Sequence, residues 1–268
     1  MHFAPLCLLL LLAPDEAPVK KPAKAYTLRY VSRKGDKYVE TSERSVLIEQ
    51  ILGKSLVTWD IVSKEVLERT ILEVKDQRPD IERVIVREMT KHVKKSPDQR
   101  NLGEEKSPAT GARFVWRRVG ERWGLFGQRS EVTDRHRDLV SRLKSWPDAR
   151  LPKKPVKAGD KWVMTATEYL ETVGQPVPPG TEGRIAFTLE KVDAKSVATI
   201  VINGAWTYRI VDVKYVVKQK GTWRFDIKRG RDLSLAADGE IDISGSQEGK
   251  GRMSLKRLVT WADAKKPK

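Results

Sequence analysis

Three acidic side chains close together in the sequence are the first candidates for catalysis. Glu240 and Asp242 lie two positions apart, with Asp238 nearby, and alternate residues of a strand share one face. Paired carboxylates could serve as general acid and base in a hydrolase, or could bind calcium. The solvated face of an ordinary strand after an Asp-Gly turn would carry the same residues. We favour this last interpretation.

A basic, aromatic segment at 113–123 is the strongest candidate for a binding site. Between residues 91 and 157 there are 18 Lys and Arg against 8 Asp and Glu. Arginines interleaved with aromatic rings could hold anionic groups of a polyanion. An amphipathic strand, with Trp116 in the core and the arginines in water, would show the same pattern. The candidate residues for polyanion binding are Arg113, Trp116, Arg117, Arg118, Arg122 and Trp123.

Histidine and cysteine chemistry is sparse. Beyond His2 the chain has only His92 and His136, both in polar, basic surroundings that are typical of solvated side chains. Cys7 is the only cysteine, so the rest of the chain can form neither a disulfide nor a thiolate metal site. Phosphate-binding, nucleophile-elbow and dinucleotide motifs are absent from the sequence. We therefore predict no catalytic residue, no metal site, no cofactor and a function other than that of an enzyme.

The amino-terminal segment predicts export. The apolar run 6–13 is too short to span a bilayer but fits the apolar core of a secretory signal, although no Lys or Arg precedes it. We assign residues 1–25 to a signal peptide and tether. The formal net charge of +16 indicates an anionic partner. For an exported protein, anionic lipid or a cell-wall polymer is more accessible than nucleic acid, which we do not expect to bind.

Short β-type runs bounded by Gly, Asp and Pro dominate the chain. The segment 45–52 fits either a strand or a short helix, and we favour the strand. We interpret 93–111 as a long loop, and 112–119 and 122–126 as a hairpin around Gly120-Glu121. The other expected strands are 26–32, 37–43, 56–62, 66–74, 81–89, 161–169, 184–192, 196–202, 207–217, 222–228, 232–243 and 252–261.

One segment has a clear helical pattern. Residues 134–145 carry an apolar stripe formed by Leu139, Val140 and Leu143, with acidic residues near the start and basic residues near the end. We predict a connecting helix there. It divides the chain into a β-rich first half, 26–147, and a β-rich second half, 148–262, followed by a disordered tail at 263–268.

A short motif is the basis for a resemblance. The segment 151–162, LPKKPVKAGDKW, follows the pattern LPxKPVxxGDxW and resembles a group of exported bacterial β-rich proteins of unknown function. The group implies the same layout and no catalytic residue, and by fold analogy its long strands resemble envelope sheets that shelter an acyl chain. A weak echo between 35–39 and 159–163 leaves open whether the two halves are related.

These observations favour a mainly β protein whose long antiparallel strands form a curved sheet, several such sheets or a partial barrel. The leading hypothesis is an exported, non-enzymatic envelope or surface protein that binds an apolar or amphiphilic ligand. The alternatives are a polyanion-binding adhesion protein that uses the basic segment, and a carboxylate-dependent hydrolase.

Overall fold

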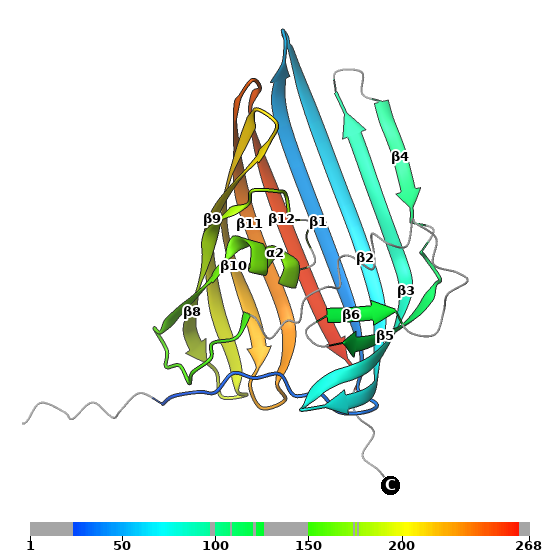
Figure 1. Cartoon of the computed structure of the whole chain (residues 1–268), viewed down its shortest axis with the longest axis vertical. Coiled ribbons are helices and arrows are strands. Elements are labelled where there is room, and N and C mark those ends of the chain that lie inside the picture. The colour runs from blue at the N-terminus through cyan, green and yellow to red at the C-terminus, as the bar shows by residue number, and fades with distance from the viewer. Residues whose placement is uncertain are drawn as a thin grey trace, which may run out of the picture.

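The fold is one large antiparallel sheet, seen in a computed structural model (Figure 1). The structure describes residues 24–96, 100–107, 109–119, 122–125, 150–173, 175 and 177–262. The sheet has 12 strands in the order β6-β5-β3-β2-β1-β12-β11-β10-β9-β8-β7, and β4 also pairs with β3. Among the described residues, β6 at one end of this order pairs only with β5, and β7 at the other end pairs only with β8, so the sheet is open. This confirms the predicted curved sheet of long antiparallel strands.

The strands fall into two meanders. The first comprises β1 (Lys37–Leu52), β2 (Ser55–Lys75) and β3 (Arg78–Lys95), followed by the short strands β4 (Arg100–Lys106), β5 (Arg113–Val119) and β6 (Arg122–Leu125). The second comprises β7 (Lys161–Thr165), β8 (Glu182–Val192), β9 (Val197–Ile210), β10 (Val213–Asp226), β11 (Arg231–Gly245) and β12 (Glu248–Trp261). The two meanders join where β1 pairs with β12 from Tyr38↔Trp261 to Ile51↔Glu248. The strands of both predicted halves therefore belong to a single sheet.

Several predicted strands are parts of longer ones. The ambiguous segment 45–52 belongs to β1, and the runs 56–62 and 66–74 are both within β2. The predicted hairpin at 112–126 is confirmed by the pairing of β5 with β6.

Other element predictions were wrong. The predicted strand 26–32 forms only a single bridge, Tyr26 to Val156, and the predicted loop 93–111 contains β4. The predicted strand 207–217 is interrupted by the turn at Val211-Asp212, because the chain reverses there between β9 and β10. The predicted helix 134–145 lies outside the described residues.

The predicted strand 161–169 ends early because a helix begins inside it. The helix is α2 (Ala166–Thr172), and its N-cap is Thr165. The Thr165 side chain accepts a hydrogen bond from the backbone N–H of Glu168, and the Glu168 carboxylate accepts one from the backbone N–H of Thr165. This reciprocal capping satisfies donors that the helix itself leaves unpaired, which favours a helix over continuation of the strand.

Apolar residues on alternate positions of the strands form two separate cores. The larger core lies over β8–β12 and is covered by α2 and by side chains of two extended segments, Leu28 and Val156. The smaller core lies between β2, β3 and β5 and includes Phe114 and Trp116. Between them, the same face of β1 and β12 carries buried polar side chains, among them Glu40 and Ser42.

Candidate functional site

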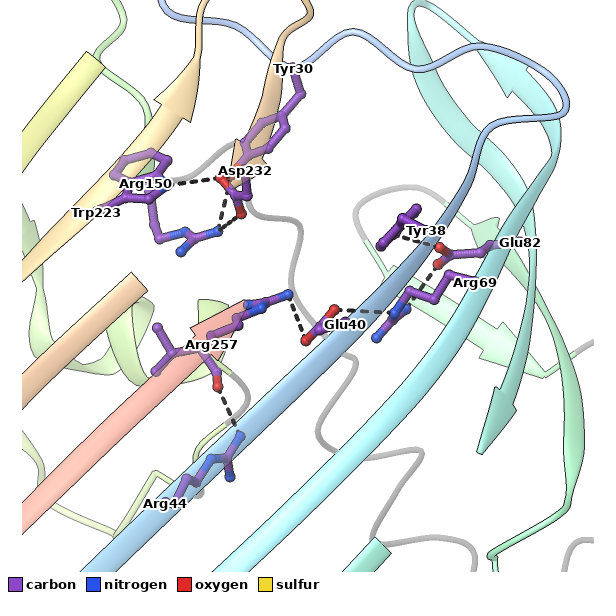
Figure 2. A network of polar contacts seen from close by, with 11 residues as sticks. Tyr30, Tyr38, Glu40, Arg44, Arg69, Glu82, Arg150, Trp223, Asp232 and Arg257 are labelled. Carbon is purple, nitrogen blue, oxygen red and sulfur yellow. Dashed lines mark hydrogen bonds and ion pairs between the residues drawn. The ribbon is translucent and has the colours of Figure 1, made fainter. Parts of the chain in front are cut away.

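The buried polar face between the two cores has two clusters of charged residues (Figure 2). The first surrounds Asp232 of β11. One carboxylate oxygen accepts hydrogen bonds from the Tyr30 hydroxyl at 2.7 Å and the Trp223 indole at 2.9 Å. The other pairs with the Arg150 guanidinium at 2.8 Å, and Arg150 also lies over the Trp223 ring. This cluster connects the sheet to two extended segments, the one that contains Tyr30 and the one that begins at Arg150.

The second cluster crosses from β12 to β3 through Glu40 of β1. Glu40 pairs with Arg257 of β12 at 2.8 Å and with Arg69 of β2 at 3.3 Å. Arg69 pairs in turn with Glu82 of β3 at 3.0 Å, and Glu82 accepts a hydrogen bond from the Tyr38 hydroxyl at 2.8 Å. Four neighbouring strands are thus connected by ion pairs across the junction of the meanders.

Burial and paired charges set the ionisation of these groups. Burial by itself would raise the pKa of Glu40, but Arg257 and Arg69 outweigh it, and the pKa lies below its ordinary value of 4.5. Burial raises the pKa of Tyr30 and Tyr38 well above the ordinary value, and that of Tyr169 in α2 to about 12. The carboxylate of Glu40 is therefore charged and the tyrosines are neutral at neutral pH. These clusters connect neighbouring strands to one another and to the extended segments that cover them.

The opposite face of the sheet has a hollow of about 1130 Å³. Its lining residues come from eight consecutive strands of the sheet order, from Val163 on β7 to Asp60 on β2. Two rows of residues in register across the strands form most of it. The first row is Ala186, Asn203, Lys220, Asp238, Ser254 and Ser45, and the second is Ala205, Lys218, Glu240, Arg252 and Leu47. The small and apolar residues lie toward the ends of the two rows, whereas the charged residues lie in the middle of them, on β10, β11 and β12.

The carboxylates considered for catalysis lie on this same face, between basic strands. Asp238 is in register with Lys220, and Glu240 with Lys218 on one side and Arg252 on the other. Asp242 is in register with Lys250 of β12. Opposite charges on adjacent strands stabilise a sheet pair, which accounts for the three carboxylates as a solvated charge ladder. Asp238 and Glu240 line the hollow, and Asp242 does not.

The structure distributes the basic, aromatic segment over both faces of β5. Trp116 is buried in the smaller core, whereas Arg113 and Arg117 are exposed on the opposite face. Arg118 is half-buried. The backbones of Arg122 and Trp123 belong to β6, in register with Val119 and Arg118, and their side chains lie outside the description. Trp116 is therefore separated from the exposed arginines, whereas Arg83 of β3 is in register with Val115 between them.

Sequence reasoning missed every member of the buried clusters. Arg150 and Asp232 are 82 positions apart, and Tyr30 and Asp232 are 202 positions apart. No local spacing marks such pairs. The one usable signal was charge within apolar strand patterns, such as Glu40 and Arg69. Within the described part of the chain, no group of three or more His, Cys, Asp and Glu side chains could hold a metal ion, and no helix has the length and apolarity to cross a membrane.

Comparison with known proteins finds distant structural likeness. No family model and no curated protein matches the chain. A structure of lipovitellin, described for its lipid–protein interactions, aligns with 88% of this chain at 7% identity and a TM-score of 0.49. This chain spans about a quarter of that one, 26% of its length.

Two further similar structures are those of bacterial proteins. An outer membrane channel from Pseudomonas putida F1 aligns with 87% of this chain and 98% of its own, at 7% identity and a TM-score of 0.26. The translocator domain of the autotransporter NalP from Neisseria meningitidis aligns with 85% of this chain and 89% of its own, at 9% identity and a TM-score of 0.26. At such values the function has to be argued from the site itself.

Proposed function

We propose that this protein is a non-enzymatic protein of the cell envelope or cell surface that binds an amphiphilic ligand in the hollow across β7–β12, β1 and β2. The observation that carries the proposal is the hollow itself, with its volume of about 1130 Å³. Pockets for small molecules typically have volumes of about 300–1,000 Å³. This hollow exceeds that range, which favours a ligand with a long chain over a compact metabolite.

The lining supports an amphiphile in particular. Leu47, Val163, Ala186 and Ala205 give apolar contact surface, and Val163 is an exposed large hydrophobic side chain at one end. Burying such surface against an acyl chain is favourable by about 25 cal/mol for each Å². The long stems of lysine and arginine add further apolar contact while their charged groups remain in water.

The charged residues of the hollow fit a polar or anionic head group. Four basic residues, Arg184, Lys218, Lys220 and Arg252, stand against three acidic ones, Asp60, Asp238 and Glu240. The balance is slightly basic, and the charges alternate between strands. A chain lying along the alanines and a head group among the basic side chains would use both features of the hollow.

Native mass spectrometry tests this function directly. We expect the protein purified from the envelope without detergent to carry a stoichiometric organic ligand that solvent extraction identifies as an amphiphile. Ala205→Phe should obstruct the apolar part of the hollow and reduce the additional mass. The matched control is Ala236→Phe. Ala236 of β11 is an exposed alanine on the same face of the sheet as Ala205, but it does not line the hollow. A bare protein mass for the wild type, or equal ligand loading of both variants, would contradict the proposal.

Polyanion binding is the second candidate, favoured by the arginines of β5 and β3. Arg113 and Arg117 are exposed on one face, and Arg83 is in register between them. We expect Arg113→Ala with Arg117→Ala to elute from heparin at lower salt than the wild type, because each lost cation removes one contact with the polyanion. Arg224→Ala, an exposed arginine of β10, is the control. Unchanged elution of the double variant would exclude this surface as the polyanion site.

A further inference from the structure

Three hairpin turns lie at the same end of the sheet, the upper end in Figure 1. They are Gly53-Lys54 between β1 and β2, Val211-Asp212 between β9 and β10, and Ser246-Gln247 between β11 and β12. The strand register places them together, since Ile51 pairs with Glu248 and Val213 pairs with both Ile210 and Gly245. This end of the sheet is called the hairpin end below.

Apolar side chains are concentrated at the hairpin end. Nine large hydrophobic side chains of the described residues are exposed, and four of them flank or occupy just two of these turns. Ile51 and Leu56 flank the first turn with 49% and 59% exposure, and Ile210 and Val211 stand at the second with 52% and 91%. Single exposed hydrophobic residues are common on protein surfaces, but pairs of them at two tips of the same end of the sheet, with the β11–β12 hairpin between, indicate an interaction surface.

Val211 occupies its position against the backbone preference. It is the first residue of a two-residue turn and has a φ of +55°. Glycine is the favoured residue where such a turn requires positive φ, and a β-branched side chain is strained there. Below the turn, Tyr208 and Tyr215 stack at 4.8 Å and stabilise the hairpin that holds it. A strained and almost fully exposed valine is best explained by a use for its side chain.

The charges around the turns indicate the kind of partner. Within three residues of the three turns there are four basic residues, Lys54, Arg209, Lys214 and Lys250, and two acidic ones, Asp212 and Glu248. The exposed apolar side chains sit at two separate tips, whereas a stable protein interface buries a continuous surface of about 800 Å² on each partner. Apolar tips flanked by cations match the boundary of an anionic bilayer, where aliphatic groups enter the acyl region and cations contact the head groups.

We propose that the hairpin end docks the protein on an anionic phospholipid bilayer, with Ile51, Leu56, Ile210 and Val211 inserted at the membrane surface. The strands then stand on the membrane and do not cross it. This surface is distinct from the hollow, and docking does not depend on a ligand being bound there.

Vesicle co-sedimentation tests the proposal. The probes are vesicles of phosphatidylcholine alone and of phosphatidylcholine mixed with phosphatidylglycerol. We expect the wild type to bind the mixed vesicles more strongly, with an affinity that falls as salt is added. Ile51→Ser with Leu56→Ser, and separately Val211→Gly, should each weaken binding by about tenfold or more, since each removes aliphatic groups that would enter the bilayer.

Two controls separate docking from folding. Val211→Gly relieves the backbone strain, so its thermal midpoint should equal or exceed that of the wild type while its vesicle binding falls. Leu258→Ser removes an exposed leucine of β12 far from the hairpin end and should leave vesicle binding unchanged. Ala205→Phe should also dock normally, which distinguishes this surface from the ligand site.

Three results would overturn the proposal: no binding of the wild type to mixed vesicles, tip variants that bind as the wild type does, or tip variants that change the oligomeric state and leave vesicle binding intact. The last result would assign the hairpin end to contacts between copies of this chain.

Discussion

Asp232 and Arg150, 82 residues apart in the sequence, form an ion pair of 2.8 Å with the arginine side chain fully buried. The pair fixes the extended segment that precedes β7 against β10 and β11, and Trp223 and Tyr30 complete the hydrogen bonds of the carboxylate. A charge this deeply buried is tolerated only with its partner in place. Asp232 therefore holds both extended segments against the larger core, through Tyr30 and Arg150.

Asp232→Ala should destabilise the protein strongly. The substitution leaves Arg150 buried without its counter-ion and removes the acceptor for two aromatic donors, so we expect a loss of about 3–5 kcal/mol in the free energy of unfolding. Urea titration followed by tryptophan fluorescence measures it, since Trp223 lies at the site. Asp238→Ala, an exposed carboxylate on the opposite face of β11, should change stability by less than about 0.5 kcal/mol. Equal losses for the two variants would contradict a special role for Asp232.

Glu40 should make the protein sensitive to acid. Its pKa is lowered in the folded protein, so the stabilisation by its ion pairs is fully present above the ordinary carboxyl pKa and is lost as the pH falls through the folded value. We expect Glu40→Gln to be less stable at neutral pH and to show a flatter dependence of stability on pH below about 4.5. Urea unfolding at a series of pH values measures both effects.

The control for Glu40 lies on the same strand. Glu43→Gln removes a carboxylate on the exposed face of β1 and should keep the neutral-pH stability within about 0.5 kcal/mol of the wild type. A Glu40→Gln curve parallel to that of the wild type at acid pH would show that the ion pairs with Arg69 and Arg257 contribute little.

The N-cap of α2 should contribute measurably to stability. Thr165→Ala removes the side-chain acceptor for the Glu168 N–H, and we expect a loss of about 1 kcal/mol. Thr165→Ser retains the acceptor and should behave nearly as the wild type. Thermal unfolding of the two variants side by side measures the difference, and a loss of similar size for both would point to the lost methyl group instead of the cap.

Two glycines with the same backbone angle give a test of close packing. Gly230 and Gly53 both have a φ of +63°, but a Cβ on Gly230 would lie 2.6 Å from the Val31 nitrogen, whereas a Cβ on Gly53 meets nothing within 4 Å. Gly53→Ala should therefore cost only the backbone term of about 1 kcal/mol. Gly230→Ala should cost more, because it also displaces the segment 26–32 and its hydrogen bond from the Val31 N–H to the Gly230 carbonyl. Chemical unfolding compares them, and equal losses would show that this segment packs loosely.

The β-rich class could be predicted from the sequence because it depends on local patterns of residue types. Alternating residues such as those around Trp59 predict strands, and turn residues such as Gly53 mark where strands end. Where local patterns were ambiguous the predictions failed. The strand 207–217 was placed across the Val211-Asp212 turn, since valine gives no turn signal, and α2 was hidden because Val163 and Met164 continue as a β pattern into its cap.

The candidate site was predictable only in part for the same reason. The sequence by itself determined residue types and their alternation, which was enough to anticipate a charged face at Asp238, Glu240 and Asp242 and a core position for Trp116. Only the tertiary structure decided that β1 pairs with β12. That pairing determines the ion-pair partners of Glu40, the rows of residues that line the hollow and the position of the hairpin turns at one end of the sheet. Those relationships depend on strand order and register between segments more than 200 residues apart, and pairing of that kind leaves no local trace in a single sequence.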